Sequence, residues 1–168
     1  MKSILIIGLG RFGRHLCQKF MSLNNEVMIV DRDEAAVSAL ADNVTSAQIA
    51  DCTDENALRA LGVQNFDICF VCIGSDFASS LLVTSMLKDM GAAHIIAKAS
   101  RDVHAKLLLR NGADEVVYPE RDSAERLATR LSARNVFDYI ELTDEYSIYE
   151  IPPLESWVGR SVRDVDAV

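Results

Sequence analysis

Apolar residues along this chain follow two alternating patterns. Six short runs are rich in apolar residues, and each is followed by a stretch in which apolar and polar residues recur with helical spacing. The short runs predict β-strands at residues 3–8, 26–31, 46–50, 67–74, 94–99 and 115–118. The stretches after them predict helices near residues 12–23, 33–41, 54–61, 76–90, 101–110 and 122–135.

This order of elements predicts an α/β fold. Apolar strands that alternate with helices are typical of a parallel sheet that helices cover on both faces. Six such units indicate a Rossmann-like, doubly wound six-stranded parallel sheet, which binds ligands at the carboxyl ends of its strands where the strand order reverses. We predict a first domain at residues 1–140, including a crossover helix at 120–140, and then a linker and the truncated start of a second domain at 141–168.

The segment after the sixth strand has two local signals. Asp122 and Glu125 fit a capping box at the start of the last helix, and Pro119 lies just before it. The apolar segment NVFDYIEL follows that helix, although the sheet is already complete. We therefore expect Phe137 and Ile140 at an interface rather than in the core.

A glycine motif joins the first strand to the first helix. In IIGLGRFG, Gly8 permits a tight turn, Gly10 lets a phosphate approach the backbone, and Gly13 lets helix and strand pack closely. The start of the helix offers free N–H groups and the positive end of its dipole to an anion. The spacing alone is weak support for a nucleotide site, but the strand before it and the helix after it provide the required context.

Asp31 strengthens this interpretation. It ends the second strand, 18 residues beyond Gly13, where a carboxylate accepts hydrogen bonds from ribose hydroxyls. The same carboxylate would repel a 2′-phosphate, which disfavours NADP, although Arg32 beside it would weaken that repulsion. The alternative for Asp31 is a turn residue at a strand end, which the glycines make less favourable.

Other strand ends should line the same crevice. The residues are Asp51, Cys52 and Thr53 after the third strand, Ile73 and Gly74 at the fourth, and Lys98 at the fifth. A charged residue in an apolar strand requires a partner, so we expect Lys98 to face an acid or a phosphate. Thr53 is equally compatible with the N-cap of the next helix.

Composition excludes several other classes. The net charge of −8 argues against nucleic acid as a main partner, and no apolar run is long enough for a membrane span. The spacing of Cys69 and Cys72 resembles a metal or redox pair, but residues three apart on a strand point to opposite faces, which favours two core cysteines. We expect a cytoplasmic protein.

Few residues suggest catalysis. None of the four tyrosines has a lysine four residues later, and His15, His94 and His104 are scattered, so surface or hydrogen-bonded core positions are expected for them. Nucleotide sensing is therefore favoured over chemistry, because a bound ligand can shift a conformational equilibrium. A small NAD-dependent oxidoreductase and an S-adenosylmethionine-dependent methyltransferase remain as alternatives.

The sequence resembles the RCK domains, also called KTN or TrkA-N domains, and most closely the KtrA-type regulatory subunits of Ktr/Trk potassium uptake systems. The similarity rests on IIGLGRFG with VDRD, on SDFASSLLVTSMLKDMGA, on AKA, on LLLRNGADEVVYPERD and on NVFDYIELTDEYSIYEI. It covers nearly the whole chain. Members of this family normally continue into a second regulatory domain, of which only the last residues here resemble the start.

The resemblance implies roles for individual residues. ATP and ADP compete in Ktr-type members, whereas many Trk-type members respond to NADH and NAD. Arg11 matches an arginine that reaches the terminal phosphate; as a surface residue it would instead oppose the helix dipole. Glu120 matches a glutamate that helps to bind Mg²⁺, Ca²⁺ or Na⁺ near the phosphates, although a carboxylate at a helix start is equally well explained by the dipole. The candidate nucleotide-binding residues are Gly8, Gly10, Arg11, Phe12, Gly13, Asp31, Arg32, Asp51, Cys52, Thr53, Ile73, Gly74, Lys98 and Glu120.

The resemblance also implies an assembly. Family members form homodimers and then octameric rings beneath a membrane-embedded, potassium-translocating subunit similar to KtrB or TrkH. Nucleotide binding changes the shape of the ring and so controls potassium transport, without catalysis. The protein is accordingly expected at the inner face of the cell membrane, held there by its partner.

Overall fold

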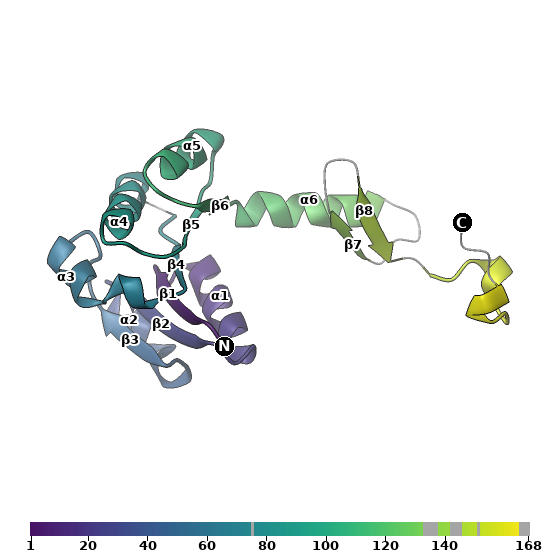
Figure 1. Cartoon of the computed structure of the whole chain (residues 1–168), viewed down its shortest axis with the longest axis horizontal. Helices are drawn as coiled ribbons and strands as arrows, with labels where there is room; N and C mark the ends of the chain where they lie inside the picture. The colour runs from purple at the N-terminus through teal and green to yellow at the C-terminus, as the bar shows by residue number, and fades with distance from the viewer. Residues whose placement is uncertain (75, 133–137, 142–145, 151, 165–168) are drawn as a thin grey trace. The chain divides into compact units, whose positions relative to one another are not determined.

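The computed structural model describes residues 1–168 except 75, 133–137, 142–145, 151 and 165–168. The chain divides into two compact units, Met1–Glu120 and Arg121–Val168 (Figure 1). Each unit is described separately below.

The first unit is built on a six-stranded parallel sheet. Its strand order is β3-β2-β1-β4-β5-β6, and all five neighbouring pairs run parallel. The strands are β1 (Ser3–Ile7), β2 (Glu26–Asp31), β3 (Ser46–Ile49), β4 (Ile68–Val71), β5 (Ile95–Lys98) and β6 (Glu115–Val117). This order confirms the predicted doubly wound, Rossmann-like fold, and it reverses between β1 and β4.

Helices connect successive strands of the sheet. They are α1 (Arg11–Ser22), α2 (Glu34–Ser38), α3 (Glu55–Ala60), α4 (Phe77–Asp89) and α5 (Asp102–Arg110), with short 3₁₀ helices at Ala41–Asn43 and Val63–Asn65. Three of the α-helices begin at an aspartate whose side chain accepts a backbone N–H bond: Asp33, Asp54 and Asp76. Thr53 is therefore not the N-cap of α3, because Asp54 occupies that position.

Side chains of β1 alternate between two hydrophobic cores. Ile4 and Ile6 pack with residues of α1 and α2, whereas Leu5 and Ile7 pack with residues of α3, α4 and α5. All four side chains are at most 2% exposed. Because each such burial contributes about 1.5–3 kcal/mol, this strand is the centre of the unit, and the loop that follows it starts from a rigid position.

The second unit contains a helix and a two-stranded sheet. Helix α6 spans Pro119–Ser132, so its first two residues belong to the first unit. The predicted start at residue 122 with a capping box of Asp122 and Glu125 is wrong. Pro119 is itself the first helical residue, a position that suits proline because its ring fixes a helical φ and the first N–H needs no partner.

The rest of the second unit was predicted only in part. Strand β8 (Ser147–Glu150) lies in the segment predicted to begin a second domain, whereas its antiparallel partner β7 (Asp138–Glu141) was not predicted as a strand. Short 3₁₀ helices follow at Glu155–Trp157 and Val162–Asp164. Phe137 and the side chain of Ile140 lie outside the described residues, so their expected interface role stays a prediction, as does the boundary of the first domain at residue 140. No helix in the described part of the chain has the length and apolar character of a membrane span.

The four cysteines are all free and buried, which confirms the core positions of Cys69 and Cys72. Burial raises the pKa of both thiols to about 12, so they stay protonated and unreactive near neutral pH. Among the described histidines, His104 is the buried one, at 3% exposure, and its ring packs against Phe77 in a tilted arrangement with the ring centres 4.7 Å apart. Its Nε2 atom has no hydrogen-bond partner among the described residues, which differs from the expected hydrogen-bonded core histidine.

His104 should make stability depend on pH. Burial, followed by the charge of Arg101, lowers the pKa of this imidazole below its ordinary value of about 6.5. The unfolded chain therefore binds more protons, and stability should fall as the pH drops below about 6.5, by roughly 1.4 kcal/mol per pH unit at most. Urea unfolding between pH 7.5 and 5.5 measures this slope. His104→Leu should reduce it, whereas His15→Gln, at an exposed histidine, should leave it unchanged; equal slopes in all three proteins would contradict the assignment.

Candidate functional site

Most of the residues predicted to bind a nucleotide lie at one edge of the sheet, where the parallel strands have their carboxyl ends. The reversal of strand order between β1 and β4 opens a crevice there, because the connections from these two strands leave toward opposite faces. The loop between β1 and α1 forms the floor of this crevice, and its geometry depends on three glycines.

The loop can close only without side chains at two of these positions. Gly8 has φ +97°, and a Cβ there would lie 3.1 Å from the carbonyl carbon of Cys72. A Cβ on Gly13 would lie 2.1 Å from the carbonyl oxygen of Gly8, which no packing adjustment accommodates. Gly10 differs, because nothing lies within 4 Å of a Cβ built there. The backbone at Gly10 therefore faces open space, as close approach of a ligand requires.

The start of α1 has unpaired donors. Gly10 is its N-cap and has no side chain to accept a hydrogen bond, and no acidic residue lies in the first turn. The first helical bond within this turn runs from the Arg14 amide to the Gly10 carbonyl at 3.0 Å. The amides of Arg11, Phe12 and Gly13 therefore precede the regular hydrogen bonding of the helix, and they are the groups that commonly bind a phosphate.

Asp31 holds the glycine loop from the side of β2. Its Oδ2 accepts a hydrogen bond from the Leu9 amide at 2.6 Å, and its Oδ1 accepts one from the Asp33 amide at 2.9 Å. Each carboxylate oxygen keeps one lone pair, so Asp31 still has acceptors for the predicted contact with a ribose. Asp31 thus has a structural role that the spacing of the motif did not reveal.

Arg14 is a residue that the sequence analysis missed. Its Nε donates to the Leu9 carbonyl at 2.7 Å, so Leu9 is held through its amide by Asp31 and through its carbonyl by Arg14. The sequence does show a second arginine within one helical turn of Arg11, which could have pointed to a role in this loop. No motif assigns it a role, because it supports the loop rather than facing the crevice.

The third strand contributes an acid and a buried thiol. The amide and hydroxyl of Thr53 both donate to Asp51 Oδ1, at 2.9 and 2.7 Å, and these bonds lower the pKa of Asp51. Cys52 is 5% exposed and belongs to the core, where burial raises its pKa to about 12. Its side chain therefore packs in the core, and only its backbone remains for the ligand contact predicted from the sequence. Ile73 after β4 is likewise half-buried against this core.

A lysine–glutamate pair lies at the other side of the crevice. Lys98 Nζ at the end of β5 donates to Glu120 Oε1 at 2.7 Å. The pKa of Glu120 is lowered first by this hydrogen bond and further by the charges of Lys98 and Arg11. A Cβ on Gly74 would lie 3.5 Å from Lys98 Nζ, an ordinary van der Waals distance, so the ammonium lies directly beside this glycine. The acid that was expected as a partner for Lys98 is Glu120.

Charge is therefore unevenly distributed along the crevice. Asp31 ends β2 and Asp51 follows β3 on one side, while Arg11 begins α1 and Lys98 ends β5. Arg32 is close enough to Asp51 to influence its pKa. An elongated ligand with a polyhydroxyl end and an anionic end would match this distribution.

Glu120 by itself does not form a metal site. Within the described residues, no cluster of three or more histidine, cysteine, aspartate or glutamate side chains is arranged to hold a metal ion. The Glu120 carboxylate is also engaged by Lys98. A cation at Glu120 would need most of its ligands from elsewhere, because one carboxylate does not fill the oxygen shell of Mg²⁺ or Ca²⁺.

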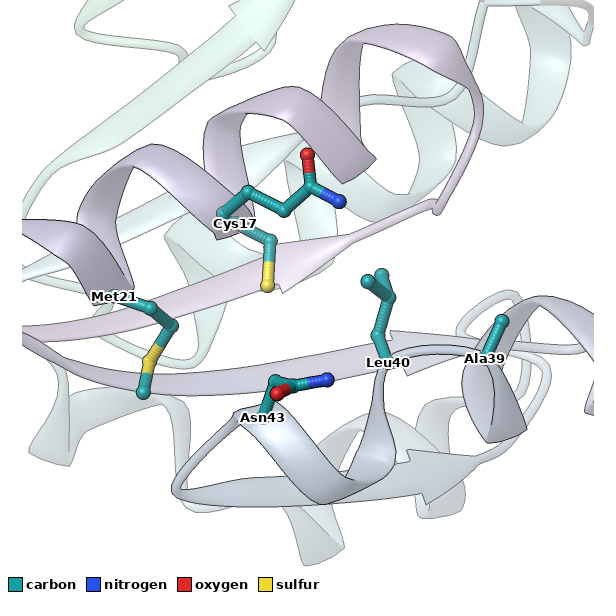
Figure 2. Close-up of a pocket in the computed structure, with 6 residues that line it drawn as sticks. Cys17, Met21, Ala39, Leu40 and Asn43 are labelled. Carbon is teal, nitrogen blue, oxygen red and sulfur yellow. The ribbon is translucent and has the colours of Figure 1, made fainter.

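A separate hollow of about 420 Å³ lies between α1 and the segment after α2. Figure 2 shows Cys17 and Met21 on one side of it, and Leu40 and Asn43 on the other. These residues come from the second half of α1 and from the chain after α2, away from the glycine loop. Burial raises the pKa of the Cys17 thiol, so it is not an activated nucleophile.

Comparison with known proteins agrees with this geometry. The family model of the TrkA-N domain matches residues 4–119. The chain belongs to the TrkA-N family. The TrkA-N match begins within β1, includes the other five strands of the first unit and ends at the first residue of α6.

Relatives extend the similarity of this TrkA-N chain beyond the matched domain. It is 42% identical over 165 residues to Ktr system potassium uptake protein C of Bacillus subtilis, covering 98% of this chain and 75% of that protein. It is 39% identical to Ktr system potassium uptake protein A of the same organism, covering 98% and 74%. Among solved structures, the GsuK channel bound to NAD has a TM-score of 0.70 at 22% identity, covering 85% of this chain and 26% of that one. The GsuK structure bound to ADP has a TM-score of 0.66 at 23% identity, covering 77% and 34%.

Alanine substitutions at Gly13 and Gly10 should have different effects on stability, because a Cβ has no room at Gly13 and open space at Gly10. Gly13→Ala should lower the free energy of unfolding by at least about 2 kcal/mol, because its methyl group meets a backbone oxygen. Gly10→Ala should cost less than about 1 kcal/mol, since an alanine N-cap is only mildly unfavourable and the space is open. Urea unfolding followed by circular dichroism measures both. Similar losses in the two variants would contradict this geometry.

Proposed function

We propose that this chain is a nucleotide-binding regulatory subunit of a potassium uptake system and that it senses ATP and ADP without consuming them. The uncapped first turn of α1, beside open space at Gly10 and with Arg11 and Lys98 near it, carries this proposal. The relatives in Bacillus subtilis are named as Ktr potassium uptake proteins, which supports the same biological context.

The arrangement of charges suggests an orientation for the nucleotide. The ribose would lie at Asp31 and the phosphates at the start of α1, with Phe12 and Gly13 contributing amides there. Arg11 would contact the terminal phosphate, so that the extra charge of ATP over ADP is recognised by a guanidinium. A cation such as Mg²⁺ would be held between Glu120 and the phosphates, with further ligands from outside this single chain.

NAD and NADH form the second candidate pair. The distantly similar GsuK channel has been solved with NAD and also with ADP, so one fold accommodates both ligand types. The same loop and Asp31 would bind the adenosine half of either ligand. In that case Arg11 would face the pyrophosphate rather than a terminal phosphate.

Calorimetric titration with ATP, ADP, NADH and NAD tests the proposed ligand. We expect ATP and ADP to bind more tightly than the dinucleotides, without turnover of ATP on prolonged incubation. Arg11→Ala should weaken ATP binding about tenfold and ADP binding less, because it removes one charge-assisted contact to the terminal phosphate. Lys19→Ala removes an exposed cation from the last turn of α1 and serves as the control for net charge.

Each contrary outcome has a separate meaning. Equal losses for ATP and ADP in Arg11→Ala would refute the terminal-phosphate role. A preference for NADH and NAD would replace the ligand pair while keeping the regulatory function. Reduction of NAD in the presence of small alcohols or acids would instead support an oxidoreductase.

We also propose a homodimer that uses α6, with further assembly into an octameric ring beneath a potassium-translocating membrane subunit. None of the α6 residues whose exposure is described is buried, and Leu127 and Leu131 are 48% and 72% exposed. Exposed leucines on a helix favour an interface with another chain. Arg126 and Arg130 lie one turn apart on the same helix, which would make the rim of such an interface basic. Arg134, four residues later in the sequence, lies outside the described residues. Through this membrane partner the protein would sit at the cytoplasmic face of the membrane.

A leucine substitution tests the homodimer. Leu131→Asp should raise the dimer dissociation constant about tenfold or more, because it buries a charge in an apolar contact. Light scattering at micromolar concentration should then report the monomer mass, while circular dichroism stays unchanged. Ser132→Asp adds the same charge at a neighbouring exposed position and should leave the dimer intact. A monomeric wild-type protein would contradict the proposal.

A further inference from the structure

We propose that Arg14 is a positioning residue for the nucleotide: by holding the Leu9 carbonyl, it aims the Gly10 amide at a bound phosphate. This inference rests on the proposed function, because it assumes that phosphates bind at the start of α1. The role differs from the one proposed for Arg11, since Arg14 would act through the backbone and Arg11 through its own charge.

A specific contact holds the Arg14 side chain. Its Nε donates to the Leu9 carbonyl oxygen at 2.7 Å, a length within the range of charge-assisted hydrogen bonds. Arg14 lies near the start of α1, where the positive end of the helix dipole disfavours a cation. The side chain nevertheless turns back past the start of the helix to a residue five positions earlier. The bond to Leu9 is therefore the favourable contact that offsets an unfavourable place for an arginine.

The Leu9 carbonyl and the Gly10 amide belong to the same peptide group. In a trans peptide the C=O and N–H bonds point in opposite directions, and none of the described peptide bonds is cis. A bond that fixes the Leu9 carbonyl on the side of Arg14 therefore directs the Gly10 N–H away from Arg14.

The Gly10 amide is available to a ligand. In the described part of the chain, no backbone or side-chain group accepts a hydrogen bond from it. Nothing lies within 4 Å of a Cβ built on Gly10, so the backbone there adjoins open space. This amide is thus a donor beside the unpaired amides of the first turn of α1, and the Arg14 bond sets its direction.

Two successive peptide groups of the loop are held by side chains. Asp31 Oδ2 accepts a bond from the Leu9 amide at 2.6 Å and fixes the peptide group before Leu9, while Arg14 fixes the one after it. The Leu9 side chain is 1% exposed and packs in the core with α1 and β2. Rotation of the Leu9–Gly10 peptide group is the motion that the Arg14 bond restrains. A donor that already points at its ligand needs less ordering when the ligand binds.

Two uncharged side chains of equal length separate the hydrogen bond from the charge. The Nε2 of a glutamine can take the place of the arginine Nε, whereas a methionine puts a methyl group there. Arg14→Met should bind both ATP and ADP about three- to tenfold more weakly than Arg14→Gln, because its Gly10 amide is no longer held. Adenosine, which has no phosphate, should differ less than about twofold between these variants. Calorimetry measures the affinities, and Lys19→Gln, at the other end of α1, controls for net charge.

A second measurement follows the peptide group itself in the absence of nucleotide. The heteronuclear NOE of the Gly10 amide nitrogen should be lower in Arg14→Met than in Arg14→Gln, because the peptide group gains freedom to rotate. The Gly91 amide, which donates to the Lys88 carbonyl after α4, should have the same value in both variants. Circular dichroism verifies that each variant is folded.

The outcomes distinguish this inference from the proposed function. Equal ATP affinities of Arg14→Met and Arg14→Gln would overturn the positioning role, because any effect of Arg14 would then come from its charge. Equal NOE values for Gly10 would also overturn it, as would a loss of affinity that adenosine shares. If wild-type protein binds ATP, the nucleotide site stands whatever Arg14 does. If wild-type protein binds none of the nucleotides, the proposed function falls and this inference falls with it.

Discussion

The contact of Gly13 with the Gly8 carbonyl is the constraint on which this molecule depends. It brings the start of α1 against the end of β1 at a distance that leaves no room for a Cβ. The central strand is buried on both faces, so the loop begins from a rigid base. Because the helix approaches so closely, its unpaired amides face the same crevice as the ends of the neighbouring strands.

Around this contact, polar groups hold the loop before any ligand arrives. Asp31 and Arg14 bond the two sides of the Leu9 peptide, while the pair of Lys98 and Glu120 balances charge across the crevice. The loop is thus preorganised, and little ordering would be needed when a ligand binds.

Prediction from the sequence succeeded where local patterns were strong. The six strands, their parallel arrangement and the glycine loop follow from apolar runs and motif spacing, and the fold confirms them. It failed at the start of α6, where Pro119 begins the helix and Asp122 lies within it. It also missed β7, because a short strand in a two-stranded sheet has no strong pattern of its own. The ligand contacts predicted for the individual residues of the crevice stay predictions.

The sequence by itself determined the class of fold and the place of the crevice, because side-chain periodicity and glycine spacing act over a few residues. Only the tertiary structure decided which charges meet. Lys98 and Glu120 are 22 residues apart and lie on different elements, as are Leu9 and Asp31. Such pairs depend on how β2, β5 and α6 are placed in space, and no local pattern encodes that placement. The same reason explains why Cys52 packs in the core although its neighbour Asp51 faces solvent.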